Sequence, residues 1–122
     1  MTLTEYLTAA RDKPFCWGEH DCARFAAGWV EAVTGRNPMV GWRYTTQVGA
    51  ARALARRGFA TLADAVAAEL PEIPLAYAME GDIAMVDGAC GIVGGEVVYV
   101  LRSEGLGIVP MARAKRAFAC RM

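Results

Sequence analysis

The residues with the clearest chemical potential lie in one segment, Trp17 to Phe25, which reads Trp-Gly-Glu-His-Asp-Cys-Ala-Arg-Phe. Cys22 directly follows Asp21, a residue type that favours the N-cap position of a helix. A thiol in the first turn of a helix faces unpaired backbone N–H groups and the positive end of the helix dipole, which stabilise the thiolate. Cys22 is therefore a candidate nucleophile of a thiol hydrolase. It is equally well placed to be the first core residue of an apolar helix.

His20 is the only histidine of the chain, and so the only imidazole that could act as a general base for that thiol. It precedes Cys22 by two residues, in the loop that enters the helix. A base and its nucleophile usually come from different elements, because the substrate carbonyl has to fit between them. Two roles are therefore open, a working base or a side chain that binds backbone groups or lies at the surface, and the second is favoured. The neighbouring Glu19 and Asp21 are expected to favour the protonated imidazole.

The remaining cysteines, Cys16, Cys90 and Cys120, are predicted to be small buried apolar residues. None of the cysteines has the C-x-x-C spacing of a structural zinc site, so neither a metal nor another cofactor is predicted. The N-terminus lacks the basic start and apolar stretch of a signal peptide. We therefore expect synthesis in the cytoplasm and no disulfide framework.

Length and charge restrict the classes of partner. The chain has 122 residues, of which 55% are hydrophobic and 21% charged, and its 13 basic and 13 acidic residues leave no net charge. These values predict one globular domain, residues 1–122. Without a basic excess no nucleic-acid partner is predicted. No apolar run reaches the ~18 residues of a membrane span, so no membrane partner is predicted either.

Two kinds of pattern divide the chain. Apolar residues spaced three or four apart, each series preceded by a polar N-cap, predict helices at about residues 2–11, 22–33, 45–55 and 61–70. After Gly81, glycine-containing turns separate short apolar runs, which predict strands at about residues 82–86, 89–93, 96–101, 106–109 and 117–120. Helices ahead of strands predict an α+β domain, with the N-terminal helices packed on a C-terminal antiparallel β-meander.

This order of motifs resembles the NlpC/P60 superfamily of papain-like cell-wall amidases and peptidases. There, a Trp-Gly loop leads to an Asp-Cys pair at the start of a helix, as Trp17-Gly18 and Asp21-Cys22 do here. The superfamily's later Gly-Asp and His-x-Gly-Ile motifs match residues 81–82 and 89–92. The resemblance covers about residues 15–109 and is strongest to a small offshoot encoded by phages and prophages among tail-assembly genes. It implies a papain-like core with a cleft lined by Trp17, Gly18, Asp21 and Ala89.

The sequence differs from the superfamily at the position of the catalytic base. The superfamily's histidine falls on Ala89, which accepts no proton. Loss of the base of a catalytic triad typically costs several orders of magnitude in rate. Asp21 is better explained as an N-cap than as a catalytic acid.

Two functions remain open. The first is a thiol hydrolase that cleaves amide bonds of peptidoglycan peptides, with Cys22 as nucleophile and His20 as base, and that is impaired by the substitution at Ala89. The second is a catalytically inactive papain-like scaffold that acts as an assembly or interaction module of a phage tail. The partner is accordingly a peptidoglycan peptide or a phage tail protein, and the second function allows incorporation into the phage particle.

Overall fold

Four helices occupy the first part of the chain, as predicted, in the computed structural model, which describes residues 1–122. They are α1 (Leu3–Arg11), α2 (Cys22–Thr34), α3 (Gln47–Arg56) and α4 (Leu62–Glu69). Each begins at an N-cap whose side-chain oxygen accepts a hydrogen bond from the backbone N–H three residues on; the caps are Thr2, Asp21, Thr46 and Thr61. These local bonds explain why each helix begins where the sequence predicts.

The second part of the chain forms a six-stranded antiparallel sheet. Its strands are β1 (Glu72–Ile73), β2 (Ile83–Val86), β3 (Ala89–Val93), β4 (Val97–Arg102), β5 (Gly105–Pro110) and β6 (Arg116–Phe118), with short 3-10 helices η1 (Leu75–Tyr77) and η2 (Met111–Arg113). The spatial order is β1-β6-β2-β3-β4-β5. Strands β2 to β5 form the predicted meander, whereas β6 returns to the opposite side of β2. The α+β class is confirmed, and β1 is a strand that the sequence did not predict.

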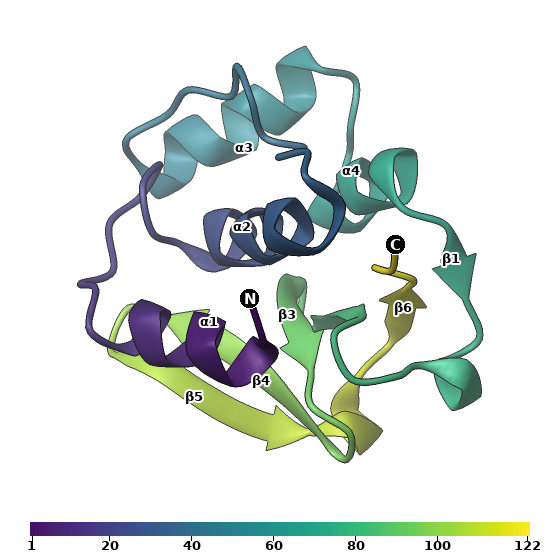
Figure 1. Cartoon of the computed structure of the whole chain (residues 1–122). Helices are drawn as coiled ribbons and strands as arrows, with labels where there is room; N and C mark the ends of the chain where they lie inside the picture. Colours follow the sequence, from purple (N-terminus) through teal and green to yellow (C-terminus); the bar gives the residue numbers. More distant parts are fainter.

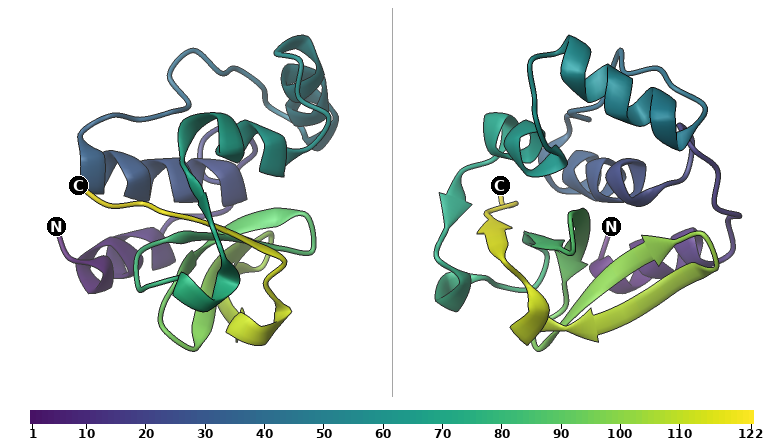
Figure 2. Two further views of the ribbon diagram at one scale, coloured as in Figure 1. Left: turned by 90° about the vertical axis from the view of Figure 1, so that its right-hand side faces the viewer. Right: turned by 180° about the vertical axis from the view of Figure 1, so that it is seen from behind.

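The helices cover one face of the sheet: α2 and α4 lie side by side against it, and α3 lies on the far side of α2 (Figures 1 and 2). The main apolar core lies between α2 and the sheet and includes Phe25, Trp29, Ile92 and Phe118. The other face carries a smaller apolar cluster, mainly of valines. None of the helices has the length and apolarity that crossing a membrane requires.

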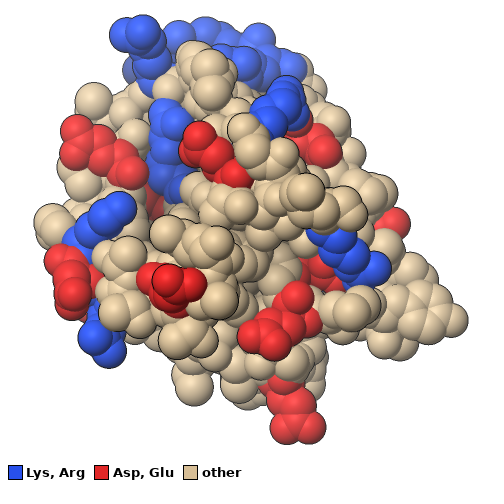
Figure 3. Space-filling model, viewed as in Figure 1, with Lys and Arg blue, Asp and Glu red and all other residues tan.

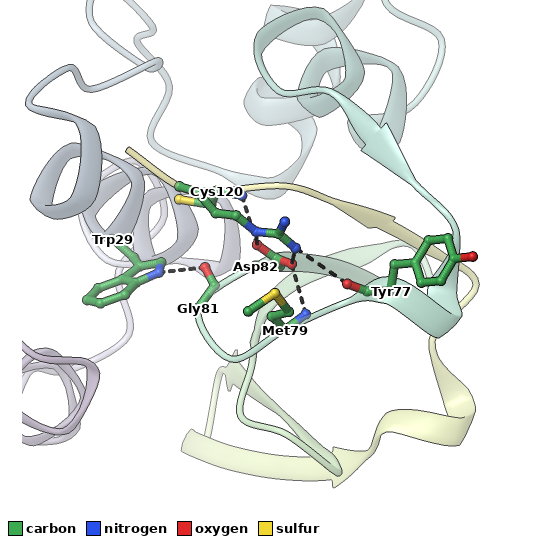
Figure 4. Close-up of polar contacts among 7 residues, drawn as sticks. Trp29, Tyr77, Met79, Gly81, Asp82 and Cys120 are labelled. Carbon is green, nitrogen blue, oxygen red and sulfur yellow. Dashed lines mark hydrogen bonds and ion pairs between the residues drawn. The ribbon is translucent and has the colours of Figure 1, made fainter.

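The Gly81-Asp82 pair joins the start of β2 to helix α2 and to the end of the chain (Figure 4). Trp29 of α2 donates its indole N–H to the carbonyl oxygen of Gly81 at 2.8 Å. The Asp82 carboxylate is 0% exposed and accepts backbone N–H bonds from Met79 and Cys120. It also forms an ion pair with Arg121 at 2.7 Å. A buried carboxylate with this many donors is fully compensated, so the pair fixes α2 against the sheet.

Candidate functional site

Asp21 is the N-cap of α2, as predicted, and it organises the whole entry to that helix. Its carboxylate is 1% exposed and accepts hydrogen bonds from the backbone N–H groups of Gly18 at 2.9 Å and Arg24 at 2.8 Å. A third bond comes from the hydroxyl of Tyr44 at 2.7 Å. Because all these donors converge on one carboxylate, Cys22 is held in a fixed position on the first turn of α2.

Tyr44 is a part of the site that sequence reasoning missed. Burial raises the pKa of Tyr44, and its hydrogen bond to the Asp21 carboxylate raises it further. The phenol therefore stays protonated and remains a donor to Asp21. Its backbone closes over Gly18, where a Cβ atom would lie 1.9 Å from the Tyr44 carbonyl oxygen. Gly18 also has a φ of +87°, which favours glycine.

Arg24 holds the segment before α3 against α2. Its guanidinium donates to the carbonyl oxygens of Met39 at 3.1 Å and Trp42 at 2.5 Å. It also lies over the Tyr44 ring, 5.8 Å from the centroid. Arg24 thus has a structural role in this loop.

The side chain that reaches Cys22 from the sheet belongs to Cys90 of β3. The Cys90 thiol is 1% exposed and donates to the carbonyl oxygen of Cys22 at 3.3 Å. The interaction of the Cys22 side chain with the Cys90 thiol lowers the pKa of Cys22, an effect that outweighs the opposing effect of burial. The same contact, together with burial, raises the pKa of Cys90 well above its ordinary value. Cys90 therefore keeps its proton at neutral pH, and its interaction with Cys22 favours the thiolate form over the thiol.

Ala89 does not take part in this contact. In the β2–β3 hairpin Ala89 pairs with Val86 and Cys90 pairs with Met85. Successive residues of a strand point to opposite faces, so Ala89 lies on the face opposite the one on which Cys90 meets α2. The residue of β3 that faces the thiol is thus the neighbour of the position that the NlpC/P60 match assigns to histidine.

His20 is bound to another part of the molecule. Its Nε2–H donates to the carbonyl oxygen of Ala10, near the end of α1, at 3.1 Å, and no hydrogen bond joins its ring to Cys22. Burial is the largest influence on the ring and lowers the pKa of His20. The charge of Asp21 raises the pKa of His20, as expected, but burial lowers it more, so the protonated imidazole is disfavoured on balance.

The other residues of the loop have structural contacts. Trp17 is half-buried and packs edge-to-face on Phe15 at a centroid distance of 5.1 Å. Cys90 and Cys120 are buried as predicted, but Cys16 is exposed, so its predicted burial is wrong. Cys16 lies in the tight loop in which its backbone N–H bonds to the His20 carbonyl, and this places the side chain at the surface. No group of three His, Cys, Asp or Glu residues could hold a metal ion.

An apolar cavity of about 80 Å³ lies between α2, α4 and the segment before α3. Its walls include Val30, Met39, Phe59, Val66 and Ile83, and Cys90 borders it from the sheet. Neither Cys22 nor any of the four residues predicted to line a cleft borders this cavity. The buried thiol of the pair thus lies beside the cavity, whereas the thiol on the helix does not.

A concentration of positive charge lies on the outer helix. Between Glu31 and Asp64 the chain has no acidic residue and five basic ones, which are Arg36, Arg43, Arg52, Arg56 and Arg57. Figure 3 shows basic side chains gathered at the top of the molecule, over α3. Arg36 is paired with Glu69, and Arg57 stacks on the Trp42 ring at 4.4 Å. We call the four arginines that form no ion pair, Arg43, Arg52, Arg56 and Arg57, the arginine surface. A charge count over a short window, instead of the whole chain, would have found it.

Comparison with known proteins gives one match. The model of a protein family described as a domain of unknown function, DUF6950, matches residues 1–120. No curated protein and no solved structure matches the chain. Because the family model spans nearly the entire chain, the protein belongs to the DUF6950 family.

Proposed function

We propose that this protein is a papain-like domain of the NlpC/P60 type that does not hydrolyse amides and that acts as an interaction or assembly module. The observation that carries the proposal is the contact between Cys22 and Cys90. A thiol hydrolase needs a group that protonates the leaving amine and then takes a proton from water. Cys90 is buried and its raised pKa makes it a weak acid that keeps its proton, so it neither takes the proton of Cys22 nor readily protonates a leaving amine.

The surroundings of the thiol support the same conclusion. His20, the only imidazole, donates to Ala10 at the end of α1. Asp21 already accepts three hydrogen bonds that hold the loop together. Both polar side chains that precede Cys22 in the sequence are thus used for structure. The arrangement that remains, a cysteine on the first turn of a helix packed on an antiparallel sheet, supports descent from a papain-like enzyme.

The arginine surface is the face that we assign to the partner. Guanidinium groups bind carboxylates in a bidentate manner, so the chemistry of this surface fits an acidic protein segment. Outside residues 32–63 the chain has eight basic residues and all 13 acidic residues. A long nucleic acid would extend from the arginine surface over this acidic remainder and be repelled, which favours a protein partner. An acidic phage tail protein meets that description.

The function is tested first by the absence of hydrolysis. Purified peptidoglycan peptides are incubated with the native protein, with Cys22→Ala or with His20→Asn and then analysed by mass spectrometry. In all three samples the amount of cleaved peptide should be no higher than in buffer alone. A cleavage product formed by the native protein and lost in Cys22→Ala would contradict the proposal. Retention of that product in His20→Asn would further show that the base comes from elsewhere.

The same preparations test the binding surface. A fluorescent octaglutamate peptide should bind the native protein and lose roughly tenfold in affinity when Arg52 and Arg56 are both changed to Gln, because two ion pairs of up to ~1 kcal/mol each are removed. Changing Arg102 and Lys115 to Gln is the matched control, since it removes the same charge from exposed positions at the end of β4 and just before β6. Equal losses in both double variants would show that only net charge matters, and would remove the arginine surface from the proposal.

A further inference from the structure

Cys22 and Cys90 come from elements 68 residues apart and meet at one point of the core. Cys22 lies on the first turn of α2, and Cys90 lies on β3 with its sulfur 3.3 Å from the Cys22 carbonyl oxygen. The other two cysteines lie elsewhere. Cys16 is exposed in the loop before α2, and Cys120 follows β6 beside Asp82. The fold thus brings together two of its four thiols.

The two thiols differ in the ways that matter for oxidation. Cys22 is partly exposed and lies where the helix N-terminus favours the thiolate, which is the form that reacts with oxidants. Cys90 is buried and protonated, so it is protected from direct oxidation, and its sulfur lies 3.3 Å from the carbonyl oxygen of Cys22. In dithiol redox pairs an accessible thiolate reacts first and a neighbouring thiol then resolves the product.

We infer that Cys22 and Cys90 form a reversible disulfide when the protein meets a peroxide. The Cys22 thiolate attacks one peroxide oxygen, so that an S–O bond forms, the O–O bond breaks and the leaving hydroxide takes up a proton to become water. The sulfur of Cys90 then attacks the resulting sulfenic acid. An S–S bond forms, the S–O bond breaks, and the departing hydroxide takes the Cys90 proton and leaves as a second water.

In this reaction the two thiols lose two electrons and two protons, and the peroxide is reduced to two molecules of water. A low-molecular-weight thiol reverses it by thiol–disulfide exchange. The disulfide would tie the start of α2 covalently to β3 and would remove the thiolate from the helix N-terminus. The reaction is independent of the proposed function, because it needs neither hydrolysis nor a partner.

The experiment uses a variant with Cys16→Ser and Cys120→Ser, which retains only Cys22 and Cys90. After treatment with hydrogen peroxide and alkylation with N-ethylmaleimide, its intact mass should be lower by two hydrogen atoms, with no maleimide attached. Digestion should release one crosslinked peptide that contains both cysteines, and dithiothreitol should restore two sites for maleimide. The corresponding variant that also carries Cys90→Ser should instead gain oxygen at Cys22 and react with dimedone, because no resolving thiol remains.

Two results would overturn the inference. In the first, the variant with Cys22 and Cys90 gains oxygen atoms at Cys22 and forms no crosslinked peptide. In the second, the crosslink joins two chains, which a nonreducing gel would show as a dimer. Circular dichroism of every variant before oxidation verifies that the folded protein is compared throughout.

Discussion

Replacing Gly18 by alanine should destabilise the protein by about 2 to 5 kcal/mol, the first of the two largest effects that we expect. Gly18 has a φ of +87°, and a residue with a Cβ atom loses roughly 1–2 kcal/mol in that conformation. The new Cβ would also lie 1.9 Å from the carbonyl oxygen of Tyr44. The crowding adds about 1–3 kcal/mol, because this contact is with backbone and cannot be relieved by turning a side chain.

Gly35→Ala is the matched control for this prediction. Gly35 has nearly the same φ, +85°, but a Cβ atom added there would have no neighbouring atom within 4 Å. It should therefore lose only the conformational part, about 1–2 kcal/mol. Urea unfolding followed by circular dichroism measures both values. Equal losses in the two variants would show that Tyr44 does not close over Gly18.

Replacing Asp21 by alanine should cost about 3 to 5 kcal/mol. The substitution leaves the N–H groups of Gly18 and Arg24 and the hydroxyl of Tyr44 without their acceptor in a buried place. Each buried donor without a partner costs about 1–3 kcal/mol, although some of them regain water when the loop relaxes. The free energy of unfolding, again from urea denaturation, measures the loss.

Two comparisons separate the roles of Asp21. Thr46→Ala removes the N-cap of α3 at an exposed position and should cost only about 1 kcal/mol. Tyr44→Phe removes a single donor to Asp21, so its cost should also be close to ~1 kcal/mol. If Asp21→Ala cost no more than Thr46→Ala, Asp21 would be a simple cap and the loop would not depend on it.

The elements that local signals determine were predictable from the sequence. The helices follow from a polar cap and apolar spacing within a dozen residues, and the β2–β3 hairpin follows from Asp87-Gly88. Nonlocal features were not predictable. Strand β1 has two residues, too few for a pattern, and exists because β6 pairs with it. The placement of β6 beside β2 is likewise determined by the tertiary structure.

The candidate site likewise has local features that were predictable from the sequence and nonlocal features that were not. Asp21 was predicted as a cap because its acceptor role reaches only three residues along the chain. Tyr44 donates to Asp21 across 23 residues, which no spacing rule reveals. A strand over residues 89–93 puts Ala89 and Cys90 on opposite faces, but only the packed helix determines which face meets Cys22. Nearness in sequence allowed His20 to reach Cys22, whereas in the fold its ring binds Ala10.

The central claim is that the partner of Cys22 is the thiol of Cys90 and not the imidazole of His20. It is tested most directly by the pH dependence of the rate at which iodoacetamide alkylates Cys22, measured in a Cys16→Ser background. The rate follows the thiolate fraction, so a lowered pKa of Cys22 moves the rise of the curve to lower pH. Cys90→Ala should move the rise of the rate curve back to higher pH. Cys90→Ser should largely preserve the position of the curve, because a hydroxyl still donates. His20→Asn should leave the curve unchanged. A curve that moves to higher pH in His20→Asn and stays in place in Cys90→Ala would contradict the account.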